Sequence, residues 1–341
     1  MTGPADRAAA AESAVRRRHL CRLWGLPRTA LGRSGWPPDL GQRAHLHWNY
    51  WWQAHLLDCL VDAQLRDPRP DRLVLIDRFV STVRLRNHGR WTNEFYDDIS
   101  WLGLALQRVR AVGGRDDDAA IRVILNRLRE GFTAEGGGGI WWKQGDRFKN
   151  APANGPAAVL HARAGDRERA AELWRWMSRH LVDPASGIVW DGLRVDTGET
   201  VKLVYTYCQG VYLGACLELS EVDAAVRTVA AVAEWCVEDG VLRGQSGGDG
   251  GLFAGILARY LALAAAVLPG DAAETARDLV VTSARACWDG ASAAPGGPLF
   301  GSDWSRPAPS VDEVRADPAR DLSVQVGAWM LLEAAATCEV P

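Results

Sequence analysis

Two adjacent aspartates, Asp97 and Asp98, are the residues of this sequence best placed to do chemistry. They lie in WTNEFYDDISWLGLALQ, residues 91–107, where the sequence predicts the start of an apolar helix. Acids beside a core are costly unless they are paired, hydrogen-bonded or used in a reaction. Consecutive residues on a helical turn suit double displacement at a sugar, which needs carboxyls about 5–5.5 Å apart, better than inversion. The structural alternative is that the acids only favour a helix N-terminus through its dipole.

Two further stretches carry aromatic and polar side chains of the kind that bind sugars. The loop GGGGIWWKQGDRFKNAPANG, residues 136–155, follows four glycines with Trp141, Trp142, Lys149, Asn150 and Asn154. No GK[ST] follows these glycines, so the loop is not a phosphate-binding loop. Residues 191–214 place three polar groups at the entry of an apolar helix: Tyr205, Tyr207 and Gln209. For each single residue, helix capping or core packing stays an alternative.

An aromatic stripe in WNYWWQAH, residues 48–55, carries Trp48, Trp51, Trp52 and His55 close to one face of a predicted helix. Such a stripe is more often part of a core than a ligand platform. A lone histidine on it is more often a hydrogen-bonded core residue than a base. A short GSDW motif, residues 301–304, precedes the last predicted helix.

The elements that must position these residues are helices, because strand-like alternation is nearly missing. We predict helices at 5–24, 44–66, 70–88, 94–112, 116–132, 152–165, 167–182, 204–219, 221–238, 248–268, 271–288 and 320–338. Every second helix is apolar on nearly all sides, and the others carry a polar stripe. A helix that is apolar all round is buried, whereas an amphipathic one lies at the surface. The sequence therefore predicts an all-α (α/α)6 barrel of about twelve helices, in which an apolar inner ring is wrapped by an amphipathic outer ring.

Composition and charge restrict the function further. The chain has 341 residues, is 48% hydrophobic and carries a formal net charge of -3, so nothing favours nucleic acid or an anionic membrane. The 16 tryptophans fit either an aromatic core or a groove for sugars. The seven cysteines are scattered without a CxxC pair, and we expect neither disulfides nor a metal site. The first residues lack the apolar run of a secretory signal, so we expect a cytoplasmic protein without a membrane span.

With these stretches assembled, the sequence resembles glycoside hydrolase family 76, the endo-α-1,6-mannanases. The resemblance rests on NEFYDDISWLGLAL, GGIWWKQGDRFKNAPANG, YTYCQGVYLG, GLFAGILARYLALAAAVLP and VQVGAWMLLEAAA, in family order over residues 45–338. It implies an (α/α)6 barrel that cleaves α-1,6-mannosidic bonds with retention, with Asp97 as nucleophile and Asp98 as acid/base. It departs from the family at Cys208, which stands where an Asn is expected. Most members of the family are exported, whereas we expect no export signal here.

The resemblance also implies that the polar and aromatic residues of the two sugar-binding stretches line the groove. We expect substrate-binding roles for four further residues in the same motifs: Asn93, Tyr96, Asp191 and Asp303. If Asp98 donates a proton, its pKa must be raised, and the charge of Asp97 and apolar surroundings would both raise it. The expected substrate is an α-mannoside oligosaccharide or polysaccharide, and no cofactor is needed.

We expect residues 1–341 to form one catalytic domain, with residues 1–4 disordered, and the protein to be a monomer. Three alternatives stay open. A sugar epimerase or isomerase on the same barrel would use histidines as proton shuttles, and only His55 lies near the predicted mouth. A glycan-binding protein would keep the groove without turnover. A transglycosidase would share the covalent intermediate.

Overall fold

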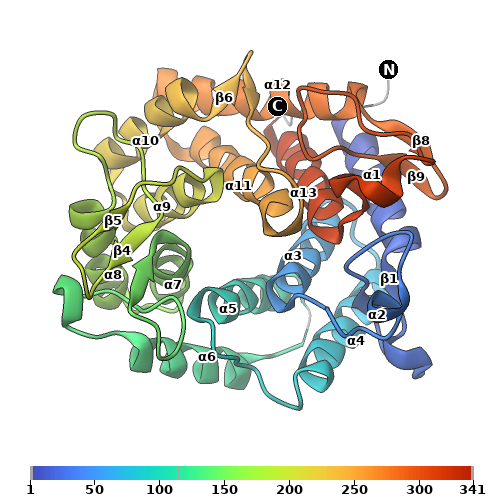
Figure 1. The fold of residues 1–341 in the computed structure, drawn as a ribbon, viewed down its shortest axis with the longest axis horizontal. Coiled ribbons are helices and arrows are strands. Elements are labelled where there is room, and N and C mark those ends of the chain that lie inside the picture. Colours follow the sequence, from blue (N-terminus) through green and yellow to red (C-terminus); the bar gives the residue numbers. More distant parts are fainter. Residues whose placement is uncertain (1–2, 114, 339–341) are drawn as a thin grey trace.

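The computed structural model describes residues 3–113 and 115–338, and this part of the chain forms a ring of helices inside a ring of helices (Figure 1). Each inner helix packs against the next, and the last packs against the first, so the inner ring is closed. The inner helices are α3 (Tyr50–Arg66), α5 (Tyr96–Ala111), α7 (Ala151–Arg163), α9 (Thr206–Leu219), α11 (Phe253–Val267) and α13 (Leu322–Cys338).

The outer helices alternate with the inner ones along the chain. They are α1 (Pro4–Arg18), α4 (Pro70–Arg86), α6 (Asp118–Gly131), α8 (Arg167–His180), α10 (Val222–Trp235) and α12 (Asp271–Asp289). One more helix, α2 (Leu40–Arg43), is a single turn, so the described residues contain thirteen α-helices rather than twelve. The predicted all-α (α/α)6 barrel is confirmed, because the apolar and amphipathic helices take the inner and outer places that their patterns require.

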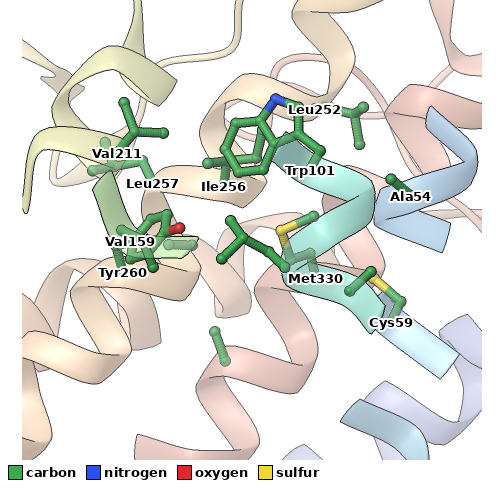
Figure 2. Packing of buried hydrophobic residues seen from close by; sticks show 14 of the residues in the cluster. Ala54, Cys59, Trp101, Val159, Val211, Leu252, Ile256, Leu257, Tyr260 and Met330 are labelled. Carbon is green, nitrogen blue, oxygen red and sulfur yellow. The ribbon is translucent and has the colours of Figure 1, made fainter. Parts of the chain in front are cut away.

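The inner helices approach closely where they carry glycine. A Cβ added at Gly255 of α11 would lie 2.5 Å from the carbonyl oxygen of Gly327 in α13, so only glycine fits there. Apolar side chains such as Trp101, Ile256 and Met330 point into the centre of the ring (Figure 2). One helical segment, Gly248–Val267, is long and apolar enough to cross a membrane, and 61% of its most apolar window is buried inside the structure.

The connections between helices contain short strands that pair as small antiparallel sheets. Their bounds are β1 (Leu20–Cys21), β2 (Leu31–Gly32), β3 (Phe148–Asn150), β4 (Gly192–Arg194), β5 (Thr200–Val201), β6 (Val237–Glu238), β7 (Val241–Leu242), β8 (Ser292–Ala294) and β9 (Gly297–Leu299). The β3–β4–β5 sheet joins the two sugar-binding stretches, with Lys149 opposite Leu193. The sequence analysis predicted no strands in these two stretches and did not predict that they pair.

Two predicted helices were too long by six residues at one end, more than any other predicted helix. The helix predicted over 5–24 ends at Arg18, because the next residues pair as β1 with β2. The helix predicted over 44–66 begins at Tyr50, because Asn49 takes a left-handed conformation with φ 47° that a helix cannot continue through. Of the four residues expected to be disordered, 1–2 lie outside the described residues, and Pro4 opens α1. The single-domain interpretation stays a prediction.

Candidate active site

A cavity of about 300 Å³ opens where four inner helices begin, and we call it the acid-pair cavity. Helix α3 contributes its first residues, and α5 contributes both aspartates of the predicted pair together with Trp101. Helix α9 contributes Tyr207, and the short 3₁₀ helix η3 (Gly248–Leu252) leads into α11. The full lining is Asn49, Tyr50, Trp51, Phe95, Asp97, Asp98, Trp101, Trp142, Tyr207, Asp249 and Phe253.

The start of α5 is fixed by Asn93, which holds both the backbone and one acid. Its Oδ1 accepts a hydrogen bond from the Phe95 N–H at 2.9 Å, and its Nδ2 donates to Asp98 Oδ2 at 2.6 Å. The Tyr96 N–H donates to the Trp142 carbonyl at 2.9 Å, which ties the helix start to the glycine-rich loop. The first turn of α5 therefore presents its two carboxyls in a defined orientation.

Trp142 comes from that loop and reaches the other acid. Its Nε1 donates to Asp97 Oδ2 at 3.1 Å, while its backbone N–H donates to the Phe148 carbonyl at 2.8 Å. The four glycines before it, residues 136–139, all have positive φ between 63° and 116°, a conformation that other residues rarely adopt. The glycines thus shape the turn that delivers the indole to the pair.

The two acids have different electrostatic surroundings. Removal from water raises the pKa of Asp97 to about 7, although backbone N–H groups and the Trp142 indole stabilise its charged form. For Asp98, removal from water and then the charge of Asp97 raise the pKa well above its usual range. Asp97 Oδ1 is buried, and within the described ranges no group donates a hydrogen bond of ordinary length and angle to it. The arrangement favours an ionised Asp97 beside a protonated Asp98.

A third acid, Asp249, faces the pair across the cavity and was not predicted from the sequence. Its Oδ1 accepts hydrogen bonds from the indole N–H groups of Trp51 at 3.0 Å and Trp52 at 2.8 Å. Its charge adds to the raised pKa of both Asp97 and Asp98. The GGDGG run around it was a usable signal, since an acid among glycines before an inner helix sits at the same end of the barrel as the pair.

Aromatic rings form one wall of the cavity. Tyr207 and Phe253 stack with ring centroids 3.8 Å apart and an interplanar angle of 2°, and Trp51 lies 6.4 Å from Tyr207. His55 lies behind Trp51 and Trp101, where burial lowers its pKa to about 3 and keeps it neutral. Among the described residues no histidine lines this cavity. Of the predicted aromatic stripe, Trp51 thus lines the acid-pair cavity, whereas Trp52 and His55 are buried in the core.

Four residues expected to bind substrate are instead buried in the framework. Lys149 Nζ donates to the carbonyls of Thr133, Glu135 and Gly138, which closes the glycine-rich loop. The other three serve as caps or bridges to backbone groups and do not line the cavity: Asn150, Asn154 and Gln209. Each of the four makes at least one hydrogen bond to a backbone group, since buried backbone groups need partners. In this structure they support the fold, and their role in binding substrate stays a prediction.

The remaining predicted residues lie around the cavity without lining it. Trp141 is buried, with Lys149 Nζ 4.3 Å from its ring centroid, and Tyr96 packs under Gly131. Tyr205 contacts Tyr207 and Phe253 from outside. Burial raises the pKa of Asp191 to about 6. Cys208 is fully buried, so it replaces no exposed contact.

Asp303 belongs to a separate loop. It accepts hydrogen bonds from the Ser305 N–H and hydroxyl and forms an ion pair with Arg306 at 3.3 Å. The structure therefore brings together Asp97, Asp98, Trp142 and Tyr207 of the predicted set, with Asn93 holding one of the acids. Within residues 3–113 and 115–338 no group of three or more His, Cys, Asp or Glu side chains could hold a metal ion.

Comparisons with a family model, with curated proteins and with solved structures show what this chain is similar to. The model of glycosyl hydrolase family 76 matches residues 28–335. A search of curated proteins found no match. Among solved structures, the GH76A α-1,6-mannanase of Salegentibacter sp. HEL1_6 is 28% identical, with a TM-score of 0.86 over 99% of this chain and 100% of that one.

Two further structures are similar over nearly their whole length. One is an inactive variant of the Salegentibacter enzyme, with two consecutive aspartates replaced by alanine, in complex with α-1,6-mannotetrose; it is 27% identical, with a TM-score of 0.87 over 99% of this chain and 100% of that one. The other is the Lin0763 protein of Listeria innocua, 27% identical, with a TM-score of 0.85 over 98% of this chain and 97% of that one.

Proposed function

The chain belongs to glycosyl hydrolase family 76 and is a glycoside hydrolase, and from this premise we propose that it cleaves α-1,6-mannosidic bonds with retention. The observation that carries the proposal is the consecutive pair Asp97–Asp98 at the floor of the acid-pair cavity, with one acid stabilised as a carboxylate and its neighbour held protonated. The Salegentibacter mannanase loses activity when two consecutive aspartates are replaced, and its variant binds α-1,6-mannotetrose.

In the first step the Asp97 carboxylate attacks the anomeric carbon of the mannose in the cavity. The bond from that carbon to the glycosidic oxygen breaks, and Asp98 donates its proton to the leaving oxygen. A mannosyl ester on Asp97 and an ionised Asp98 result. In the second step Asp98 takes a proton from water, the water oxygen attacks the anomeric carbon, and the Asp97 carboxylate leaves. Two inversions give net retention.

The neighbouring groups support this division of roles. Trp142 donates to Asp97 Oδ2, so it stabilises the carboxylate before attack and after departure of the sugar. Trp142 contacts the other oxygen, so we assign the attack to Asp97 Oδ1. The stacked Tyr207 and Phe253 rings give an apolar wall for the C–H face of a sugar.

The test is a product analysis with linear α-1,6-mannan and α-1,6-mannotetraose. Proton NMR of the first products should give the α-anomer at each new reducing end before mutarotation, and a first-formed β-anomer would contradict retention. Interconversion of free sugars without cleavage would indicate the epimerase alternative. Binding without turnover would indicate a glycan-binding protein, and longer oligosaccharides than the substrate would indicate transglycosylation.

A further inference from the structure

A second cleft lies beside the acid-pair cavity, on the other side of the start of α9. It has a volume of about 440 Å³. Thr206 lines this cleft, and the next residue, Tyr207, lines the acid-pair cavity. Gln245 lines the cleft, and Asp249, only four residues later, lines the acid-pair cavity. The wall between the two hollows is therefore one helix start and one short loop, about 10 Å thick.

Two indoles give this cleft an aromatic surface. Trp235, the last residue of α10, is 49% exposed, and Trp190 lies partly buried in the same cleft. The ammonium of Lys202 lies 4.5 Å from the ring centroid of Trp190 and covers part of it. Of these two indoles, Trp235 is therefore the one whose ring face is open to a ligand. A large indole half exposed in a concave site is contact surface that the fold itself does not use.

Polar groups around the indoles are held in place by the fold. Gln245 Oε1 accepts from the Thr206 N–H at 2.7 Å and its hydroxyl at 2.9 Å, which fixes the shared wall. Asp183 accepts from the Ser186 hydroxyl at 2.6 Å, and the exposed Arg243 is anchored through Nε to the Val237 carbonyl at 3.1 Å. One acid and one base line the cleft, so it has no charge excess that would select a phosphate or a nucleic acid.

We propose that this cleft, the Trp190–Trp235 cleft, binds a stretch of the same mannan chain whose bond is cut in the acid-pair cavity, with a mannose ring stacked on Trp235. The proposal rests on the proposed function. A neutral polyol with one apolar C–H face matches flat indoles beside fixed hydrogen-bonding groups. The acid-pair cavity, at about 300 Å³, accommodates only the sugars next to the cleaved bond, so a polymer must continue across the mouth.

The proposal predicts that long and short substrates respond differently to loss of Trp235. Holding the polymer at a neighbouring site raises its effective concentration at the acids, whereas a substrate that fills only the acid-pair cavity gains nothing. Trp235→Ala should therefore lower kcat/KM on linear α-1,6-mannan by about tenfold and leave it unchanged on an aryl α-mannoside. An indole stack of ordinary strength corresponds to a change of this size.

Binding is measured separately in the inactive Asp97→Asn background, by affinity electrophoresis in gels that contain linear α-1,6-mannan. Trp235→Ala and Trp235→Gln should both weaken retardation about tenfold, and Trp235→Phe should retain most of it because a flat ring remains. The matched control is Leu263→Ala, which removes a 41% exposed apolar side chain from the opposite end of α11. It should bind as the background does.

The outcomes separate the cleft from the catalytic proposal. If Trp235→Ala and Trp235→Gln both bind and cleave mannan as well as the parent, the proposal that the cleft binds mannan is wrong. An equal loss on mannan and aryl mannoside also contradicts it, since that places the effect in the acid-pair cavity. A parent protein that cleaves mannotetraose leaves the proposed function standing in either case. A parent that cleaves neither mannan nor mannotetraose overturns both proposals. Thermal unfolding of Trp235→Gln near that of the parent excludes a folding defect.

Discussion

The two ends of the inner ring both carry clustered acids, but only one end provides them with cations. At the end opposite the acid-pair cavity, Asp58 and Asp62 of α3 each pair with both Arg108 of α5 and Arg259 of α11. Burial acts to raise the pKa of Asp58, yet the two guanidiniums outweigh it and the pKa lies below its usual range. In the acid-pair cavity the acids face indoles, an amide and one another instead.

The contrast separates structural acids from reactive ones on the same helices. Both ends are formed by α3, α5 and α11, so the acids share their burial and the type of helix that carries them. The groups that contact each carboxyl therefore decide whether its pKa is lowered or raised. Asp58, beside two arginines, has a lowered pKa and is held as a carboxylate, whereas Asp97 and Asp98 contact no cation among the described residues, have raised pKa values and can exchange protons. A cavity of about 580 Å³ borders the arginine-paired end, and Trp101 lies between the two hollows as part of both linings.

The largest expected effect comes from removing the acids without cations. Asp97→Ala should abolish activity on every substrate, since no glycosyl ester can form. Asp98→Ala should lose about 10²–10⁴-fold on mannan but retain formation of the ester from aryl α-mannosides, whose leaving groups need little protonation. Added azide should then restore turnover and yield the α-mannosyl azide, measured by NMR, because attack repeats on the face opposite Asp97.

A different azide product would change the assignment. A β-azide from Asp98→Ala would mean direct displacement in a protein that lacks its nucleophile, and the two roles would be exchanged. Equal loss in both variants with no azide product would contradict the proposed division between nucleophile and acid/base. The control is Asp58→Asn, which should keep kcat/KM close to the parent's because the arginine-paired acids do not touch the acid-pair cavity.

The next effect is on stability, and it should have opposite signs at the two ends. An acid whose folded pKa is raised destabilises the protein above its unfolded pKa, because the folded state resists ionisation. Asp97→Asn should therefore stabilise the fold at pH 7 by on the order of 1–2 kcal/mol and lose this gain near pH 3. Asp58→Asn should destabilise it by about 2 kcal/mol at pH 7, since it leaves guanidinium charge unpaired.

Urea unfolding at pH 7 and pH 3 measures both variants. For Asp58, whose folded pKa is lowered, the stabilisation is present above the unfolded pKa of about 4 and is lost as the pH falls through the folded pKa, so the difference between variant and parent should be smaller at pH 3 than at pH 7. Asp278→Asn, on the exposed face of α12, supplies the reference and should stay within about 0.5 kcal/mol. A loss of stability in Asp97→Asn at pH 7 would contradict the contrast between the two ends.

The same contrast explains what could be predicted from the sequence. The barrel was predictable because each helix shows its burial in its sequence. A helix that is apolar on all sides belongs to the inner ring, and a helix with one polar stripe belongs to the outer ring. The pair Asp97–Asp98 was predictable because two acids beside an apolar run conflict with burial. Asp58 and Asp62 also lie in an apolar run, but their neutralising partners could not be predicted, since Asp58 and Arg259 are far apart in sequence and only ring closure brings them together.

Side-chain direction was the part that the sequence could not supply. Trp141 and Trp142 are neighbours, yet in an extended segment successive side chains point to opposite sides, and only Trp142 reaches the acids. Lys149 and Gln209 have the right chemistry for sugar hydroxyls but satisfy buried backbone groups. Asp249 was missed although the GGDGG run before an inner helix was a usable signal, because that run was interpreted only as part of a loop.

The smallest expected effect tests whether charge inside the acid-pair cavity sets the working pH. Activity requires an ionised Asp97 and a protonated Asp98, so it should rise with pH through the pKa of Asp97 and fall through that of Asp98. Asp249→Asn retains an Oδ1 acceptor for Trp51 and Trp52 but removes a negative charge. Ionisation of Asp97 and Asp98 then becomes easier, so the pKa of both acids should fall. Both limbs of the kcat/KM profile should move to lower pH, by about half a unit for a charge screened across the cavity.

Asp278→Asn makes the same charge change on the outer ring and should leave the profile in place, because solvent screens it. Limbs that stay fixed in Asp249→Asn, or that move to higher pH, would mean that burial and local hydrogen bonds alone separate the two acids.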